Sequence, residues 1–435
     1  MRTTNFSIVL RIVLFFTVLV SLFTVMEYLF IPVGARSDMM WQGYREREKI
    51  DMIFVGDSLC SSSLSTALFD EITGTCSFNM GTNSQSLKSS YLSIKKAIRE
   101  KHIRHVVLML NYPSLTNRNA FGSLKVQAAF WDAMKKDETV GANLAAYYDF
   151  LQFKDVEGKP ASLNMMMPWI YHHVKLTKNE ILKNIQDKQN KVNAYKKNNN
   201  QSIKYNKIGK ILIKPRFKQD ISQDSLTVLR RICQLCRENG VKLTVIYPPH
   251  PAFDVLSYGK RHFEVSRELK DFFGEQGVDY FDFALVKPKL FPIREEYFRD
   301  YEHINHLGKP VFSKAFAKFW ASYQKGKDVS QYFYTPEEFL HSVRHISAVS
   351  FKEIKRNGKR CLNGVSYTGP DVKTEFEYQV KREGGKTFET VQKYSMKKSF
   401  PLAGLKKGKY VIRINARIAG RGKKAERSFE KPVSI

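Results

Sequence analysis

The hydrophobic positions along this 435-residue chain fall into three successive patterns. The first is one long apolar segment, the second alternates short apolar runs with amphipathic helical stretches, and the third consists of short segments in which every second residue is apolar. These patterns are typical of a membrane-spanning or signal helix, a parallel α/β sheet and an antiparallel sheet, respectively. We therefore expect three parts, with the boundaries 1–35, 48–325 and 345–435.

The N-terminal segment is apolar on every face between residues 6 and 31, apart from Arg11 and Glu27. A stretch of this length spans a bilayer with some tilt. Arg11 and the amino terminus favour a signal anchor that leaves the rest of the chain outside the cytoplasm. The alternative is a cleaved signal peptide, because the uncharged run 12–26 has the length of an h-region and residues 33–35 form a candidate cleavage site. Both interpretations export the chain.

The middle part alternates strands with helices, which predicts a parallel sheet with helices packed on it. Its first strand is the continuous apolar run MIFV, residues 52–55. Apolar residues at helical spacing and Gly240 at a helix end mark the elements that follow. Further strands are expected at 77–80, 105–110, 241–247 and 278–283, and helices at 86–99, around 226–236 and from about Pro310.

Two basic regions interrupt or follow this domain. An insertion spans residues 112–220, and its second part, 175–218, has 13 Lys or Arg against two acidic residues and few apolar positions, which predicts a solvated helix and loop. Residues 351–435 have 22 Lys or Arg against eight acidic residues. Alternating segments such as TEFEYQVK and KYVIRINAR predict a small β-sandwich there, immunoglobulin-like in size.

The candidate chemistry lies at one edge of the predicted sheet. Ser58 directly follows the first strand, and Asp300 and His303 lie in a loop between the last strand and the last helix. The carboxyl ends of parallel strands share the edge at which such sheets bind ligands. A serine hydroxyl becomes a nucleophile when a histidine removes its proton and a carboxylate orients that histidine. We therefore expect Ser58, His303 and Asp300 to act together.

Three motifs resemble the SGNH/GDSL hydrolase superfamily: IFVGDSL around Ser58, FNMG ending at Gly81, and DYEHINHLG around His303. The resemblance covers about residues 50–325 without most of the insertion. It implies a three-layer α/β/α, flavodoxin-like domain in which Ser58 is the nucleophile, His303 the base and Asp300 its orienting partner.

The same resemblance implies an oxyanion hole formed by the N–H groups of Ser58 and Gly81 and by an asparagine side chain. Asn111 follows the strand VVLML at a suitable place. The sequence departs from the family pattern there, because no glycine precedes the asparagine by two residues. Asn83 is therefore an alternative third donor.

With its N-terminal apolar segment, the chain resembles the membrane-anchored branch related to D-alanyl-lipoteichoic acid biosynthesis and polysaccharide O-acetylation proteins. This implies a serine esterase or O-acyltransferase that acts, with acetyl as the acyl group, on a cell-envelope polysaccharide through an acyl-Ser58 intermediate. The implied partners are an acylated or acyl-accepting glycan and, for transfer, a membrane-bound acyl-donor protein. No metal or organic cofactor is implied.

The net charge of +29 suggests an anionic partner or a membrane surface. The two basic regions account for 25 of these charges, which leaves the predicted site close to neutral. Two solvated lysine-rich faces without a partner are the alternative. Nucleic-acid binding is disfavoured, because the sequence has no zinc-finger, helix-turn-helix or RRM signature and the chain is expected to be exported. The remaining functional alternative is a non-catalytic glycan-binding or envelope-assembly protein with a degenerate SGNH domain.

The five cysteines are an odd number, so they cannot all pair within the chain. Cys233 and Cys236 lie on the apolar stripe of a predicted helix, which favours core packing over a metal or redox site. Cys60 and Cys76 are predicted either to form a disulfide or to be buried free thiols.

Overall fold

The structure, a computed structural model, describes residues 2–30, 36–115, 220–422 and 424–435, together with short stretches inside the insertion: 130–131, 133–135, 141–142, 145–146, 148 and 177–189. Most of the insertion 112–220 and the candidate cleavage site at 33–35 therefore lie outside the described residues. Of the predicted basic helix and loop, the structure describes α9 (Lys178–Gln189).

A five-stranded parallel sheet forms the centre of the middle part. Its order is β2-β1-β3-β4-β5, which is the order of flavodoxin-like sheets. In the register of the central pair, Met52 lies opposite His105 and Gly56 opposite Met109. All five predicted strands are confirmed, within one residue at each end: β1 (Met52–Gly56), β2 (Ser77–Asn79), β3 (His105–Met109), β4 (Lys242–Tyr247) and β5 (Asp279–Asp282).

The two faces of the sheet bury two separate cores. In β1, Ile53 and Val55 belong to one core, and Met52 and Phe54 belong to the other. Because successive side chains of a strand point to opposite faces, a strand covered on both sides is apolar throughout, as MIFV is. The first core packs against α5 (Leu87–Lys101), α11 (Gln223–Glu238) and α13 (Lys260–Glu275), and the second against α4 (Thr66–Thr73) and α14 (Gly308–Gln324).

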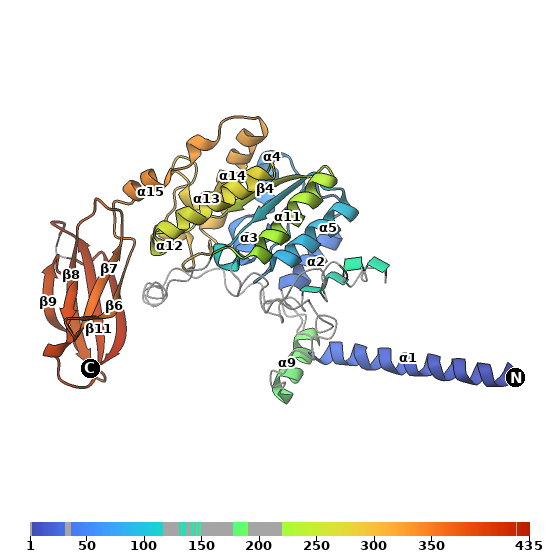
Figure 1. The fold of residues 1–435 in the computed structure, drawn as a ribbon, viewed down its shortest axis with the longest axis horizontal. Coiled ribbons are helices and arrows are strands. Elements are labelled where there is room, and N and C mark those ends of the chain that lie inside the picture. The colour runs from blue at the N-terminus through green and yellow to red at the C-terminus, as the bar shows by residue number, and fades with distance from the viewer. Residues whose placement is uncertain are drawn as a thin grey trace.

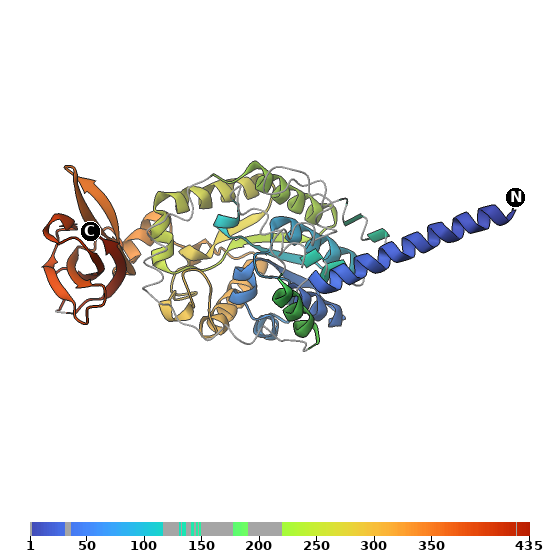
Figure 2. The ribbon, with the colours of Figure 1, turned by 90° about the horizontal axis from the view of Figure 1, so that it is seen from below.

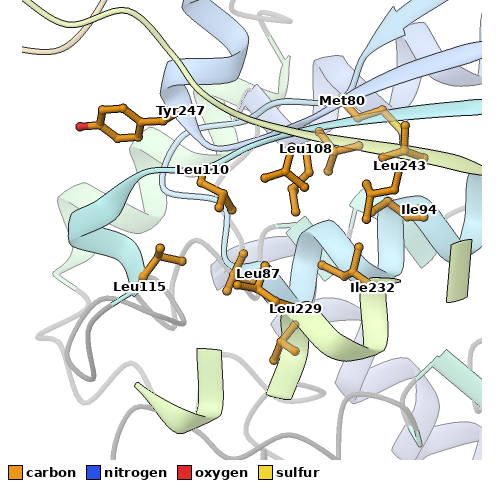
Figure 3. Packing of buried hydrophobic residues seen from close by; sticks show 14 of the residues in the cluster. Met80, Leu87, Ile94, Leu108, Leu110, Leu115, Leu229, Ile232, Leu243 and Tyr247 are labelled. Carbon is orange, nitrogen blue, oxygen red and sulfur yellow. The ribbon is translucent and has the colours of Figure 1, made fainter. Parts of the chain in front are cut away.

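Close packing of the first face is visible in Figure 3. Ile94 of α5 and Ile232 of α11 lie beside Leu108 of β3 and Leu243 of β4. Figures 1 and 2 show helices on both sides of the sheet, which gives the three-layer α/β/α arrangement. Within residues 36–115 and 220–342, the remaining α-helices are α2 (Arg36–Glu46), α3 (Ser58–Ser63), α12 (Ala252–Tyr258) and α15 (Pro336–Ser342).

The N-terminal segment is one helix, α1 (Arg2–Phe30). Among the described residues, its stretch Phe6–Phe30 is the one helix long and apolar enough to cross a membrane. Its apolar side chains are largely exposed rather than packed against the protein. Figures 1 and 2 show α1 projecting from one end of the molecule, with the C-terminal part at the other end. These features fit a membrane span or a signal helix.

The C-terminal part consists of two antiparallel sheets, as predicted. Phe351 and Leu362 of one sheet and Tyr378 and Ile414 of the other lie in a single shared core, so the sheets form a β-sandwich. The likeness to an immunoglobulin domain stays a prediction. One sheet has the order β10-β7-β6 and the other β12-β11-β8-β9. Their strands are β6 (Ala348–Arg356), β7 (Lys359–Tyr367), β8 (Thr374–Arg382), β9 (Glu389–Ser395), β10 (Ser399–Pro401), β11 (Lys409–Ile418) and β12 (Arg427–Ser434).

The five cysteines lie within the described residues, and all are free thiols. Cys233 and Cys236 lie on the buried face of α11, which confirms their role in core packing. Burial raises the pKa of the Cys233 thiol to about 11 and that of the Cys236 thiol to about 12. Cys60 is buried and donates to the side-chain oxygen of Asn79 at 3.3 Å, whereas Cys76 is exposed. The predicted alternative of buried free thiols is thus met at Cys60, whereas Cys76 is a free thiol but is exposed.

Candidate active site

The turn after β1 presents Ser58 at the carboxyl edge of the sheet. Asp57 caps the following helix, because its Oδ1 accepts a hydrogen bond of 2.9 Å from the N–H of Leu59. Ser58 is therefore the first residue of α3. The turn needs glycine at position 56, where a Cβ would lie 2.6 Å from the carbonyl oxygen of Met109 in the neighbouring strand.

The loop before α14 presents Asp300 and His303. Asp300 Oδ1 accepts hydrogen bonds from the backbone N–H groups of Glu302, at 3.0 Å, and His303, at 2.8 Å. Both oxygens of the same carboxylate lie 3.0 Å from His303 Nδ1. The aspartate thus shapes the loop and orients the histidine ring with one side chain.

These two segments meet across 245 residues of sequence. His303 Nε2 lies 2.8 Å from Ser58 Oγ. Since Asp300 accepts the Nδ1 proton, Nε2 is left as the acceptor for the Ser58 hydroxyl. The three predicted residues therefore form one continuous hydrogen-bonded relay, with the geometry that activates a serine nucleophile.

The charge of Asp300 suits this relay. Burial by itself would raise the pKa of this carboxyl, but the hydrogen bond and charge of His303, together with two backbone N–H donors, lower the pKa to about 2. Arg299 adds a cation, with its Nε 3.5 Å from Asp300 Oδ2. Asp300 is therefore ionised throughout the neutral pH range, as an orienting carboxylate must be. The sequence analysis did not single out Arg299, which precedes the motif by one residue.

Asn111 is bonded to Asp57, the residue that precedes the nucleophile. Its Nδ2 donates to Asp57 Oδ2 at 2.9 Å, which links the end of β3 to the start of α3. Burial raises the pKa of Asp57, and the Asn111 hydrogen bond opposes this rise in part. An amide nitrogen carries two hydrogens, so one N–H of Asn111 remains for another acceptor. The local sequence does not indicate this role of Asp57, because the contact depends on how the end of β3 lies against the turn after β1.

Gly81, the predicted oxyanion donor, points its N–H at a neighbouring side chain in this structure. Its N–H already donates to Asn79 Oδ1 at 2.9 Å, so in this conformation the hydrogen is not offered to a ligand. The structure instead requires glycine for close packing against α3, since a Cβ at position 81 would lie 2.7 Å from the nitrogen of Ser61 and 2.8 Å from Cys60 Cβ. Local sequence could not distinguish these two reasons for a glycine.

Asn79 is a residue that the sequence analysis overlooked. Its Nδ2 donates to the carbonyl oxygen of Cys60 at 2.9 Å, while its Oδ1 accepts from Gly81 and from the Cys60 thiol. Asn79 thus ties β2 to the helix that carries Ser58. Its only sequence signal is a polar amide at the end of a strand.

Asn83, the alternative third donor, is exposed in the turn after β2. Within the described residues its side chain makes no hydrogen bond, whereas Asn111 is joined to the nucleophile turn through Asp57. The position of Asn111 is therefore the better defined of the two.

A cleft of about 380 Å³ lies alongside α3. Ser61, Asn79, Gly81 and Lys309 form its polar side, and Met39 and Phe78 contribute apolar surface. Lys309 Nζ donates to the carbonyl oxygen of Ser61 at 3.2 Å. The cleft therefore lies between α3, the helix that carries the candidate nucleophile, and α2, the helix that follows the N-terminal apolar segment.

The known proteins that this chain resembles are solved structures. No protein-family model matches the chain, and no curated protein matches it. One similar solved structure is a putative acylhydrolase from Bacteroides fragilis, with 10% identity over 65% of this chain and 94% of that chain and a TM-score of 0.32. Another is a putative platelet activating factor from Streptococcus pneumonia, with 9% identity over 65% of this chain and 91% of that chain and a TM-score of 0.31. An endo-beta-1,4-mannanase from Thermotoga petrophila covers 91% of this chain at a TM-score of 0.16. Similarity at this level carries no functional argument, so function must be argued from the site.

Proposed function

We propose that this chain is an exported serine esterase or O-acyltransferase of the SGNH/GDSL type. The observation that carries the proposal is the relay Ser58–His303–Asp300, with contacts of 2.8 Å and 3.0 Å between its members. A buried strand, a capped helix and a carboxylate-stabilised loop hold these three side chains at the ligand-binding edge of a parallel sheet.

The reaction follows from the directions of the hydrogen bonds. As Ser58 Oγ attacks the ester carbonyl carbon, its proton moves to His303 Nε2, and Asp300 stabilises the imidazolium. His303 then returns the proton to the leaving alcohol, and an acyl group remains on Ser58. In the second half, His303 takes a proton from water or from a sugar hydroxyl as that oxygen attacks the acyl carbon. The bond to Ser58 Oγ then breaks, His303 returns the proton to Ser58, and the carboxylic acid or the acylated sugar leaves. Hydrolysis and transfer differ only in that acceptor.

Negative charge on the carbonyl oxygen needs donors near Ser58. We propose two oxyanion donors. One is the backbone N–H of Ser58, which is the first N–H of α3, and the other is the second amide hydrogen of Asn111. The N–H of Gly81 can join them only after the Asn79 side chain has released it.

A fluorophosphonate probe tests the nucleophile. The wild-type chain should be labelled covalently, because the probe reacts only with a serine activated by a neighbouring base. Ser58→Ala should remove the labelling entirely. Intact-mass spectrometry of the probe-treated protein measures both.

Ser65→Ala is the matched control for this experiment. Ser65 lies seven residues further on, precedes α4 and makes no side-chain cap hydrogen bond there, so this variant should be labelled like wild type. Labelling that persists in Ser58→Ala would assign the reactivity elsewhere. A folded wild-type chain that takes no label would instead favour the non-catalytic glycan-binding alternative.

We further propose that the substrate is an O-acetylated or acetyl-accepting envelope polysaccharide with anionic character. The β6–β7 hairpin supports an anionic polymer: Lys352, Lys355, Arg356, Lys359 and Arg360 are all exposed on it. Its one acidic residue, Glu353, is bonded to Arg360. The sandwich and α1 lie at opposite ends of the molecule (Figures 1 and 2), which favours a polymer over the lipid headgroups of the membrane that α1 would enter. In a transfer reaction, a membrane-bound donor protein would supply the acyl group.

We propose that α1 anchors the chain with residues 36–435 outside the cytoplasm. In cells that express the full chain, it should stay in the membrane pellet after alkaline carbonate washing, because removing an apolar helix of 25 residues from a bilayer is costly. Protease added to spheroplasts should digest the large part. Release of a shortened soluble chain would establish the cleaved signal peptide instead.

A further inference from the structure

We infer that the C-terminal β-sandwich holds the catalytic loop in place, with Arg427 as a positioning residue for Asp300 and His303. The inference rests on the proposed function and adds a role for the sandwich that the relay itself does not require. Arg427 touches none of the reacting atoms. It acts through the loop that begins at Glu295 and ends at His303.

The sandwich is bonded to the start of this loop through an ion pair. Arg427 of β12 places its Nη2 2.7 Å from Glu295 Oε2, and both side chains are mostly buried. Glu295 opens the short 3-10 helix η5 (Glu295–Tyr297), five residues before Asp300. A planar guanidinium in a partly desolvated ion pair fixes direction as well as distance.

Ser347, just before β6, completes this anchor. Its Oγ donates to Glu295 Oε1 at 3.1 Å and accepts from the N–H of Phe253 at 3.1 Å. Its carbonyl oxygen accepts from Arg427 Nε at 3.0 Å. One serine of the sandwich therefore bonds to the loop, to α12 of the α/β domain and to Arg427. Figure 1 shows α12 at the end of the α/β domain that faces the sandwich.

The sandwich also touches the tip of the loop. Tyr301, which directly follows Asp300, packs against a small buried cluster of Phe253, Ala348 and Tyr367. Ala348 and Tyr367 belong to β6 and β7, so a side chain next to the orienting carboxylate rests on the C-terminal part. The loop is thus held from the sandwich at two places.

Internal hydrogen bonds make the loop move as one unit. The N–H of Arg299 donates to the carbonyl oxygen of His303 at 3.0 Å, and Phe298 pairs with Ile304 in an antiparallel bridge. Asn305 Nδ2 donates to the carbonyl oxygen of Glu296 at 2.7 Å. A displacement at Glu295 is therefore transmitted to His303 rather than absorbed between them.

The test compares Arg427→Met with Arg413→Met. Arg413 is a matched control: it lies on β11 of the same sandwich and pairs with Glu430 at 2.6 Å, an ion pair made within the four-stranded sheet. With p-nitrophenyl acetate as a small substrate, we expect Arg427→Met to lower kcat about 10- to 100-fold at little change in KM, since a misplacement of about 1 Å costs about 100-fold. Arg413→Met should keep the wild-type kcat. Arg427→Lys keeps the charge but loses the planar guanidinium with its several donors, so its kcat should lie between those of the two Met variants.

A merely structural role would lower the melting temperature without splitting kcat from KM. Wild-type kcat in a folded Arg427→Met protein would therefore overturn the inference. Hydrogen exchange gives a second readout that does not depend on activity: amides of residues 295–305 should exchange faster in Arg427→Met than in Arg413→Met, and equal exchange would also overturn it. If wild type takes no fluorophosphonate label, the proposed function fails, and the exchange experiment still decides whether the sandwich holds the loop.

Discussion

His303→Ala should lower kcat for acetyl-ester hydrolysis by roughly 10⁴-fold or more, the loss expected when one member of a serine relay is removed. The reason is geometric: Nε2 of His303 is 2.8 Å from Ser58 Oγ, and the relay contains no second base. Acetate release from an O-acetylated anionic polysaccharide measures the effect, with p-nitrophenyl acetate as a small-substrate reference.

If the basic β6–β7 hairpin recognises the polymer, a neutral O-acetylated polysaccharide should show a higher KM with a similar kcat.

His306→Ala is the control for this prediction. His306 lies three residues after His303, is exposed and lacks an aspartate three residues before it. This variant should retain activity within about a factor of two, as exposed positions usually do. An active His303→Ala enzyme, or equal losses in both variants, would contradict the proposed relay.

Gly81→Ala should lower both stability and activity. The new Cβ would lie 2.7 Å from the nitrogen of Ser61 and 2.9 Å from the Cys60 sulfur, so α3 has to move. Overpacking of this kind costs about 1 to 3 kcal/mol of unfolding free energy. Because Ser58 begins α3, we also expect kcat to fall by about 100-fold. Urea unfolding measures the first effect and ester turnover the second.

Gly274→Ala supplies the comparison for Gly81→Ala. Gly274 lies within α13, and outside the adjacent backbone of its own helix no atom lies within 4 Å of a Cβ at that position, so alanine should be neutral or stabilising there. Alanine retains the backbone N–H, so a loss of stability and kcat in Gly81→Ala reports the packing of the new methyl group rather than the removal of an oxyanion donor. Unchanged stability and kcat in Gly81→Ala would show that α3 accommodates the methyl group, contrary to the role assigned to this glycine.

The strands of the sheet were predictable because burial on two faces leaves a mark in the sequence. MIFV is apolar at every position since Ile53 and Val55 pack on one face and Met52 and Phe54 on the other. The strands of the sandwich alternate instead: in β8, Phe376, Tyr378 and Val380 are buried and the residues between them are more exposed. Such patterns are local, and they are legible in a single sequence.

The relay was predictable for a related reason. In a parallel sheet the carboxyl ends of the strands share one edge, so Ser58 after β1 and the loop before α14 were both expected at that edge. Asp300 and His303 are three residues apart, and one turn of backbone brings them into contact. In the sheet β5 lies three positions from β1, so it is the docking of α14 against α3 and α4 that places the two segments within 2.8 Å.

The sequence by itself therefore determined the order of the elements, the edge that carries the chemistry and the three residues of the relay, because each of these follows from local periodicity and chain direction. Tertiary structure alone decided that Gly81 packs against α3 with its N–H bonded to Asn79, that Asp57 holds Asn111, and that Arg427 reaches Glu295 across 132 residues. These contacts join side chains from separate elements, and their formation depends on how the elements dock. No spacing along the chain encodes that docking.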